Sequence, residues 1–171
     1  NLKNAIKRIL GFDHFLPTHQ GRAAENVLFS AMIKEGDYIP GNSHCDTTKG
    51  HIEFRKAHAV DLTIDIASDT EAYHPFKGNV DIEKLEKYMA ENAAKVPFII
   101  VTITNNTAGG QPVSMECLRE VKRVADKHKK PVLFDSARFA ENAYFIKVRE
   151  KGYEKKTVKE IVREMFSYAD M

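Results

Sequence analysis

The sequence of 171 residues has only two cysteines, almost no net charge and no long hydrophobic run. Cys45 and Cys117 lie far apart, which argues against a disulfide framework. A net charge of +2 and scattered lysines argue against nucleic-acid binding. No apolar run approaches the ~20 residues that span a bilayer, and the start of the chain lacks the apolar core of a signal peptide. We therefore expect a reduced, cytoplasmic protein that binds neither nucleic acid nor membrane.

The composition that remains is that of a globular domain. Hydrophobic residues make up 43% of the chain and charged residues 29%, which is ordinary for a folded protein, and the length fits one domain. The chain begins with Asn1 rather than methionine and ends at Met171 without a tail of distinct composition. We expect it to be part of a longer protein.

Hydrophobic periodicity predicts an α/β fold in which strands and helices alternate. Strands are expected at residues 38–40 (ended by Pro40), 59–66, 96–103 and 131–135. Helices are expected at residues 3–10, 23–34, 81–94, 115–129, 141–150 and 157–168, with a short one after Thr48. The strand at 96–103 is nearly all apolar, as in a parallel sheet covered on both faces. Together with the helix and strand that follow, it forms a βαβ unit.

The strand that ends at Asp135 carries the strongest indication of a functional site. Asp135 follows a short apolar run, and Arg138 comes three residues later. This arrangement puts an acid and a base at the carboxyl edge of the sheet, where open α/β folds bind ligands. An aspartate there can hold a protonated pyridine nitrogen, as pyridoxal phosphate requires. The alternative is that Asp135 only ends the strand in solvent or caps the next helix.

Two further segments have the residue types that such a cofactor needs. Gln20, Gly21 and Arg22 enter a helix, where backbone N–H groups and a guanidinium suit a phosphate, although they could also form a simple turn. Asn106 follows the strand at 96–103, so its amide could donate to a phenolate-like oxygen that Arg138 also reaches. The alternative is an asparagine turn before the glycines of that loop.

A cluster of metal-binding residue types occurs between residues 44 and 58. His44, Cys45, Asp46, His51 and His58 are all possible zinc ligands, but their spacing matches no strong zinc pattern. We predict no metal site.

Taken together, four motifs resemble those of the tryptophanase and tyrosine phenol-lyase family, whose members are β-eliminating lyases. The motifs are Pro-Thr-His-Gln-Gly-Arg at 17–22, Phe-Lys-Gly-Asn at 76–79, Ala-Gly-Gly-Gln-Pro-Val-Ser at 108–114 and the run from 135 to 147. The resemblance implies the large domain of the type I aminotransferase fold, a three-layer α/β/α domain with a mostly parallel sheet. It also implies that residues 1–171 form part of one domain that binds pyridoxal 5'-phosphate.

The resemblance also implies roles for individual residues. Gln20, Gly21 and Arg22 correspond to the phosphate cradle. Asn106 and Arg138 correspond to the partners of the cofactor's phenolic oxygen, and Asp135 to the partner of its pyridinium nitrogen. The implied reaction splits an aromatic amino acid into indole or phenol, pyruvate and ammonia. A homo-oligomer, a tetramer in the family, is expected, and the full-length family enzyme could also use a potassium ion.

The sequence departs from the family pattern in two respects. Cys45 stands where the family places a phenylalanine over the cofactor ring, and a thiol cannot stack as an aromatic ring does. The family's Schiff-base lysine and the small domain would follow the segment that resembles 166–171, and no lysine of this chain takes that place. We therefore expect the chain alone to be inactive, and we expect the exposed sheet to cause self-association.

The choice between the two aromatic substrates depends on a few positions. Asp46 in the Asp-Thr-Thr motif and the run at 135–142 favour tryptophanase, whereas residues 34–38 and 160–170 look more like tyrosine phenol-lyase. Asp46 is the predicted catalytic residue, a polar group near the leaving aromatic ring, although it could equally cap a helix. We favour tryptophan narrowly over tyrosine.

Overall fold

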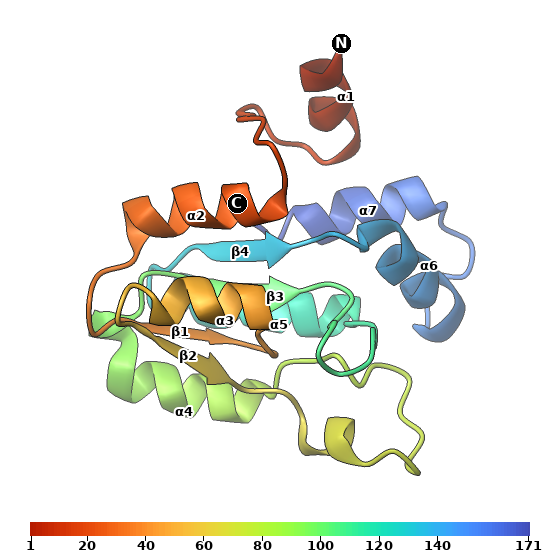
Figure 1. Ribbon diagram of the computed structural model, residues 1–171. Helices are drawn as coiled ribbons and strands as arrows, with labels where there is room; N and C mark the ends of the chain where they lie inside the picture. Colours follow the sequence, from red (N-terminus) through yellow and green to blue (C-terminus); the bar gives the residue numbers. More distant parts are fainter.

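The structure, a computed structural model, describes residues 1–171 and is built on a parallel four-stranded sheet (Figure 1). The strand order is β2-β1-β3-β4, and every neighbouring pair is parallel. The strands are β1 (Tyr38–Gly41), β2 (His58–Asp61), β3 (Ile99–Thr102) and β4 (Val132–Asp135). The predicted parallel sheet is therefore confirmed, including the β3–α5–β4 unit.

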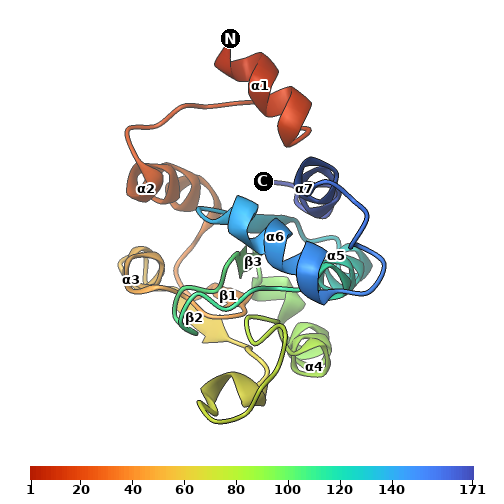
Figure 2. The same cartoon turned by 90° about the vertical axis from the view of Figure 1, so that its right-hand side faces the viewer.

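Helices cover both faces of this sheet. They are α1 (Leu2–Ile9), α2 (Gly21–Met32), α3 (Asp46–Glu53), α4 (Ile82–Asn92), α5 (Met115–Lys127), α6 (Phe139–Arg149) and α7 (Val158–Phe166), with short 3₁₀ turns at Asp65–Ser68 and Ala93–Lys95. In Figure 2 α2 and α3 lie on one face, and α4, α5 and α7 on the other. This is the predicted α/β/α arrangement. None of these helices is both long and apolar enough to cross a membrane.

The side-chain alternation of the strands divides the interior into two cores. In β3, Ile99 and Val101 join the large core beneath α4, α5 and α7, whereas Ile100 joins the smaller core beneath α2 and α3. All four residues of β3 are buried, as predicted for a central strand. Leu133 of β4 is only partly buried, because an apolar cavity of about 710 Å³ lies between β4 and α2. The expected self-association stays a prediction, and the apolar lining of this cavity is the exposed surface that would cause it.

The prediction that Pro40 ends the first strand is wrong. Strand β1 continues through Pro40 to Gly41 in the middle of the sheet. A proline has no backbone N–H to donate, and the β1–β3 pairing consists of the single pair Gly41–Ile100. Gly41 makes that close approach possible, since a Cβ atom there would clash with the carbonyl oxygen of Ile100.

Two other predicted boundaries shift for local reasons. Strand β2 ends at Asp61 rather than at residue 66, because the chain leaves the sheet and Thr63 forms an antiparallel bridge with Val80. The helix expected after Thr48 begins earlier, at Asp46, with Cys45 at its N-cap position.

Two of the sequence motifs pack against each other beside the sheet. The Gly78 N–H donates to the Pro112 carbonyl over 3.0 Å. The Asn79 side chain accepts from the Ser114 N–H at 2.8 Å and donates to its hydroxyl at 3.2 Å. A Cβ atom on Gly78 would lie 2.8 Å from the Pro112 oxygen and still closer to that of Gln111. The segment 76–79 therefore fixes the loop 108–114.

This packing predicts that Gly78→Ala destabilises the fold. We expect the free energy of unfolding to fall by about 1–3 kcal/mol, because backbone atoms must move to make room for the methyl group. Chemical denaturation measures the change. Gly50→Ala in helix α3 is the matched control, since nothing lies within 4 Å of a Cβ atom there and alanine favours a helix. Equal stability of the two variants would contradict the packing described.

Candidate functional site

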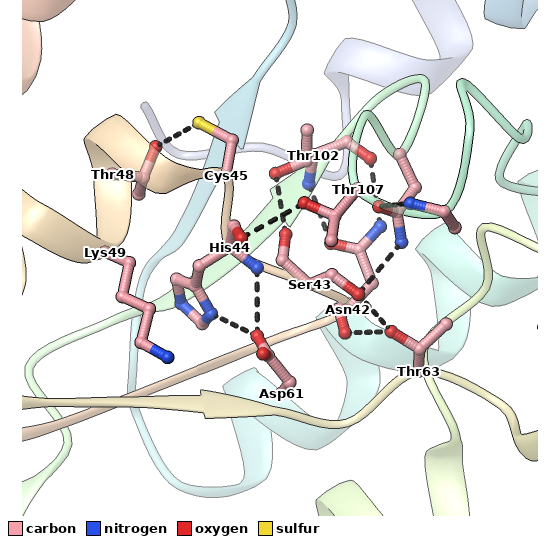
Figure 3. A network of polar contacts seen from close by, with 12 residues as sticks. Asn42, Ser43, His44, Cys45, Thr48, Lys49, Asp61, Thr63, Thr102 and Thr107 are labelled. Atoms are coloured by element: carbon pink, nitrogen blue, oxygen red, sulfur yellow. Dashed lines mark hydrogen bonds and ion pairs between the residues drawn. The ribbon is translucent and has the colours of Figure 1, made fainter. Parts of the chain in front are cut away.

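The carboxyl ends of β1 and β3 are joined by one buried asparagine. The Asn42 side chain accepts from the Thr102 N–H at 3.0 Å and donates to the Thr102 and Gly78 carbonyls, each at 2.9 Å. Asn42 is fully buried. Figure 3 shows it at the centre of a polar network that includes Ser43 and Thr63. The edge of the sheet that the sequence indicated is therefore held rigidly.

A cavity of about 450 Å³ lies at this edge. It is lined by Gln20, Gly21, Arg22, Glu25, Cys45, Thr47 and Asp135. Five of the eight predicted site residues thus meet in one cavity although they come from three separate segments. Glu25 was not predicted. Its position four residues after Gly21, on the same face of α2, was the indication that could have found it.

The start of helix α2 forms the wall of the cavity that suits an anion. Gln20 is the N-cap residue and makes no side-chain capping bond. The Ala23 N–H donates to the Gln20 carbonyl, whereas the N–H groups of Gly21 and Arg22 keep their donor capacity. Nothing lies within 4 Å of a Cβ position on Gly21, which leaves the backbone open to approach. Arg22 is exposed beside it. These groups fit a phosphate, as predicted.

Asp135 forms the opposite wall. Burial raises the pKa of this carboxyl, and the negative charge of Glu25 raises it further, while the Ala137 N–H and the Arg138 charge act in the opposite direction. A cation placed against Asp135 would reverse this balance and favour the carboxylate. The protonated nitrogen of a pyridine ring is such a cation, so the residue fits the predicted role.

Asn106 and Arg138 form a pair, as the sequence suggested. The Arg138 guanidinium donates to the Asn106 side-chain oxygen over 2.8 Å, and both residues are exposed and lie outside the lining of the cavity. Asn142 of helix α6 was not predicted to matter, but it holds the nearby loop that contains Val113. Asn142 is fully buried and bonds both backbone groups of Val113, at 2.8 and 2.9 Å. Its place within the motif that starts at Asp135 was the available indication.

The side chains of Cys45 and Asp46 lie in different environments. Cys45 is half-buried, with its sulfur 3.1 Å from the Thr48 hydroxyl and 3.3 Å from that of Thr47. Asp46 is exposed at the first position of helix α3 and does not line the cavity. In this structure Asp46 therefore stands at the helix start, where its charge favours the helix dipole.

Of the three histidines considered with Cys45 as metal ligands, His51 lies beside Glu25, with its Nε2 3.8 Å from Glu25 Oε2, whereas His44 and His58 have other partners. His44 is buried, and its Nδ1 lies 2.7 Å from Asp61 Oδ1. His58 stacks on Tyr38 with ring centroids 5.2 Å apart. Burial raises the pKa of Asp61, but hydrogen bonds from the His44 ring and backbone outweigh it and leave that pKa below its usual value. The pair fixes the residue that precedes Cys45 (Figure 3).

Comparison with known protein sequences gives consistent matches along the chain. The model of the beta-eliminating lyase family matches residues 1–171. The chain is similar to a probable beta-eliminating lyase of Trichomonas vaginalis, at 73% identity over 99% of this chain and 37% of the relative. It is also similar to a tryptophanase of Salinibacter ruber (49% identity, 98% and 36%) and to a tyrosine phenol-lyase of Pasteurella multocida (51%, 99% and 37%). The chain thus spans little more than a third of the length of these relatives.

Solved structures show the same fold at low sequence identity. An alanine aminotransferase of Pyrococcus furiosus aligns with a TM-score of 0.60 at 23% identity, over 78% of this chain and 32% of that one. Cystalysin of Treponema denticola, solved with pyridoxal 5'-phosphate, aligns with a TM-score of 0.59 at 15% identity, again over 78% and 32%. The predicted aminotransferase-like fold is confirmed.

The raised pKa of Asp135 predicts that Asp135→Asn stabilises the chain in the absence of added ligand. A carboxyl whose pKa is higher in the folded than in the unfolded state destabilises the fold above that pKa. We therefore expect a higher melting temperature for Asp135→Asn at neutral pH. The difference should disappear as the pH falls below the unfolded-state pKa of about 3.9.

Thermal unfolding across this pH range is the measurement, and Glu71→Gln, at an exposed loop position, is the control. A lower melting temperature for Asp135→Asn at neutral pH would contradict the account of Asp135.

Proposed function

The chain belongs to the beta-eliminating lyase family, and from this premise we propose that its cavity binds pyridoxal phosphate as part of an aromatic amino acid lyase. The whole protein would split tryptophan, or next tyrosine, into the free aromatic compound, pyruvate and ammonia. The observation that carries the proposal is the meeting of an uncapped helix start and a partly buried aspartate in one cavity.

Each wall of the cavity has a distinct part in this proposal. The N–H groups at the start of α2 and the guanidinium of Arg22 bind the phosphate. The Asp135 carboxylate would hold the ring nitrogen in its protonated state. Asn106 and Arg138, which lie outside the cavity lining, would be the partners of the phenolic oxygen. When bound, the cofactor supplies an electron sink for the carbanion formed at the substrate's Cα. The residues of this chain would orient the cofactor ring and keep its nitrogen protonated.

The proposal of tryptophan as the first substrate rests on few residues. Asp46 supports it only through the Asp-Thr-Thr motif, because its side chain lies outside the cavity lining. In the proposal, Asp46 is a polar group near the leaving ring once the rest of the active site is in place. The relatives of similar identity include both a tryptophanase and a tyrosine phenol-lyase.

We also propose that this chain holds the cofactor without a covalent bond. No lysine lines the 450 Å³ cavity or the neighbouring apolar one. The Schiff-base lysine, the small domain and the oligomeric partners would then come from the remainder of a protein as long as its relatives. The alternative is a truncated remnant that binds a phosphate or another protein, which the apolar cavity between α2 and β4 favours.

The phosphate assignment predicts that Arg22→Ala weakens pyridoxal phosphate binding by at least about tenfold, since a charged hydrogen bond to phosphate contributes roughly 1.5–3 kcal/mol. Absorbance or fluorescence titration of the purified chain gives the dissociation constant. Arg8→Ala in α1 removes an exposed arginine far from the cavity and serves as the matched control. Equal weakening in both variants would point to nonspecific attraction of the phosphate.

The noncovalent assignment predicts that the chain with added pyridoxal phosphate releases no pyruvate from tryptophan or tyrosine. Proton transfer at the substrate and covalent capture of the cofactor both need a lysine in the cavity. A coupled pyruvate assay, with a full-length lyase as the positive control, makes the measurement. Pyruvate release by the chain alone would overturn this part of the proposal.

A further inference from the structure

Three side chains of different elements bring metal-binding atoms together inside the cavity. Glu25 comes from the first turns of α2, Cys45 from the N-cap of α3 and Asp135 from the end of β4. One ligand atom of each lies within 4.8 Å of the others. All three residues are partly buried, so the group lies in a recess and not on an open surface.

A second set of groups orients two of these ligands. The Thr48 hydroxyl donates to Glu25 Oε1 and lies 3.1 Å from Cys45 Sγ, and Thr48 itself is 1% exposed. On the other side, His51 Nε2 lies 3.8 Å from Glu25 Oε2. Metal sites in proteins typically have such outer groups, because they fix the rotamers of the ligands before the ion arrives.

The charge of the group calls for a cation. Neither Glu25 nor Asp135 has a lysine or arginine nitrogen within 4.0 Å, and the His51 ring is the one basic group that close to Glu25. Elsewhere in the chain, carboxylates such as Glu86 and Asp170 pair with Arg123 and Lys122. The two cavity carboxylates are left for a ligand.

We propose that Cys45, Glu25 and Asp135 form a binding site for a zinc ion. A thiolate with two carboxylates matches the donors that zinc accepts, whereas magnesium and calcium take oxygen ligands only. A tetrahedral ion needs ligand atoms roughly 3.3–3.8 Å apart, which small side-chain rotations provide. The three protein ligands leave the fourth position open towards the cavity. The cysteine that departs from the family's aromatic residue is thus the ligand that makes the site possible.

This site overlaps the proposed cofactor site, and the consequence rests on the proposed function. A zinc ion and a pyridinium nitrogen at Asp135 would share its single negative charge and repel each other. Zinc therefore competes with pyridoxal phosphate, and the chain holds one or the other. We had predicted no metal site from the sequence, because the spacing of the candidate ligands between residues 44 and 58 matches no strong zinc pattern. The three ligands proposed here come from distant segments.

Cadmium is the direct probe, since its bond to a thiolate has an ultraviolet absorption band. Adding cadmium chloride to the reduced chain should produce this band, saturating at a single ion, and zinc chloride should remove it. Cys45→Ala should abolish the band while buried Cys117 remains as an internal control. Glu25→Gln and Asp135→Asn should each weaken binding at least about tenfold. Glu53→Gln, at an exposed position on α3, should leave binding unchanged.

The outcomes separate this inference from the proposed function. The zinc site would be overturned if no band appeared or if the band persisted in Cys45→Ala. It would also be overturned if neither Glu25→Gln nor Asp135→Asn weakened the band. Pyridoxal phosphate titrated with and without zinc tests the overlap, and unchanged cofactor affinity at saturating zinc would overturn the shared use of Asp135. Cadmium binding without any pyridoxal phosphate binding would contradict the proposed function and leave the zinc site standing.

Discussion

The hydrogen bonds of the Asn42 side chain are the constraint on which the site depends. The pairing of β1 with β3 is reduced to one residue pair beside Pro40, so the backbone ladder alone holds these strands weakly. The buried Asn42 side chain reinforces this pairing through hydrogen bonds to the backbone of Thr102 and Gly78. A buried amide without partners would cost its full desolvation free energy, so the three hydrogen bonds of the Asn42 side chain form together. Cys45 follows three residues after Asn42 along the chain, so this fixed point positions it.

Much of the fold could be predicted because its cause is local. The apolar run at 96–103 and the amphipathic helix after it follow from periodicity, and the sheet edge at Asp135 follows from the order of elements. Pro40 misled the prediction, because a proline is normally excluded from a central strand. The structure tolerates it through Gly41, whose missing Cβ atom is a long-range requirement that the local sequence does not show.

The candidate site residues could be predicted where they lie close together in the sequence. Gln20, Gly21 and Arg22 lie together at a helix start, and Asp135 and Arg138 lie at one strand end. Glu25 acts instead through its meeting with Cys45 and Asp135, which only the packing of α2 against the sheet produces. The same holds for the buried bonds of Asn142 to Val113. Sequence spacing describes neighbours along the chain, and these contacts join residues far apart in it.

The chemistry of the cavity depends on which cationic group binds next to the Asp135 carboxylate. Burial and Glu25 make its negative charge unfavourable, and this unfavourable charge is what a protonated ring nitrogen relieves. The start of α2, where we propose that the phosphate binds, lines the same cavity, so one ligand can contact both the helix start and Asp135. A crystal structure of the chain with bound pyridoxal phosphate tests this most directly. The account predicts the phosphate at the start of α2 and the ring nitrogen against Asp135; a cofactor bound elsewhere, or in the reverse orientation, would contradict it.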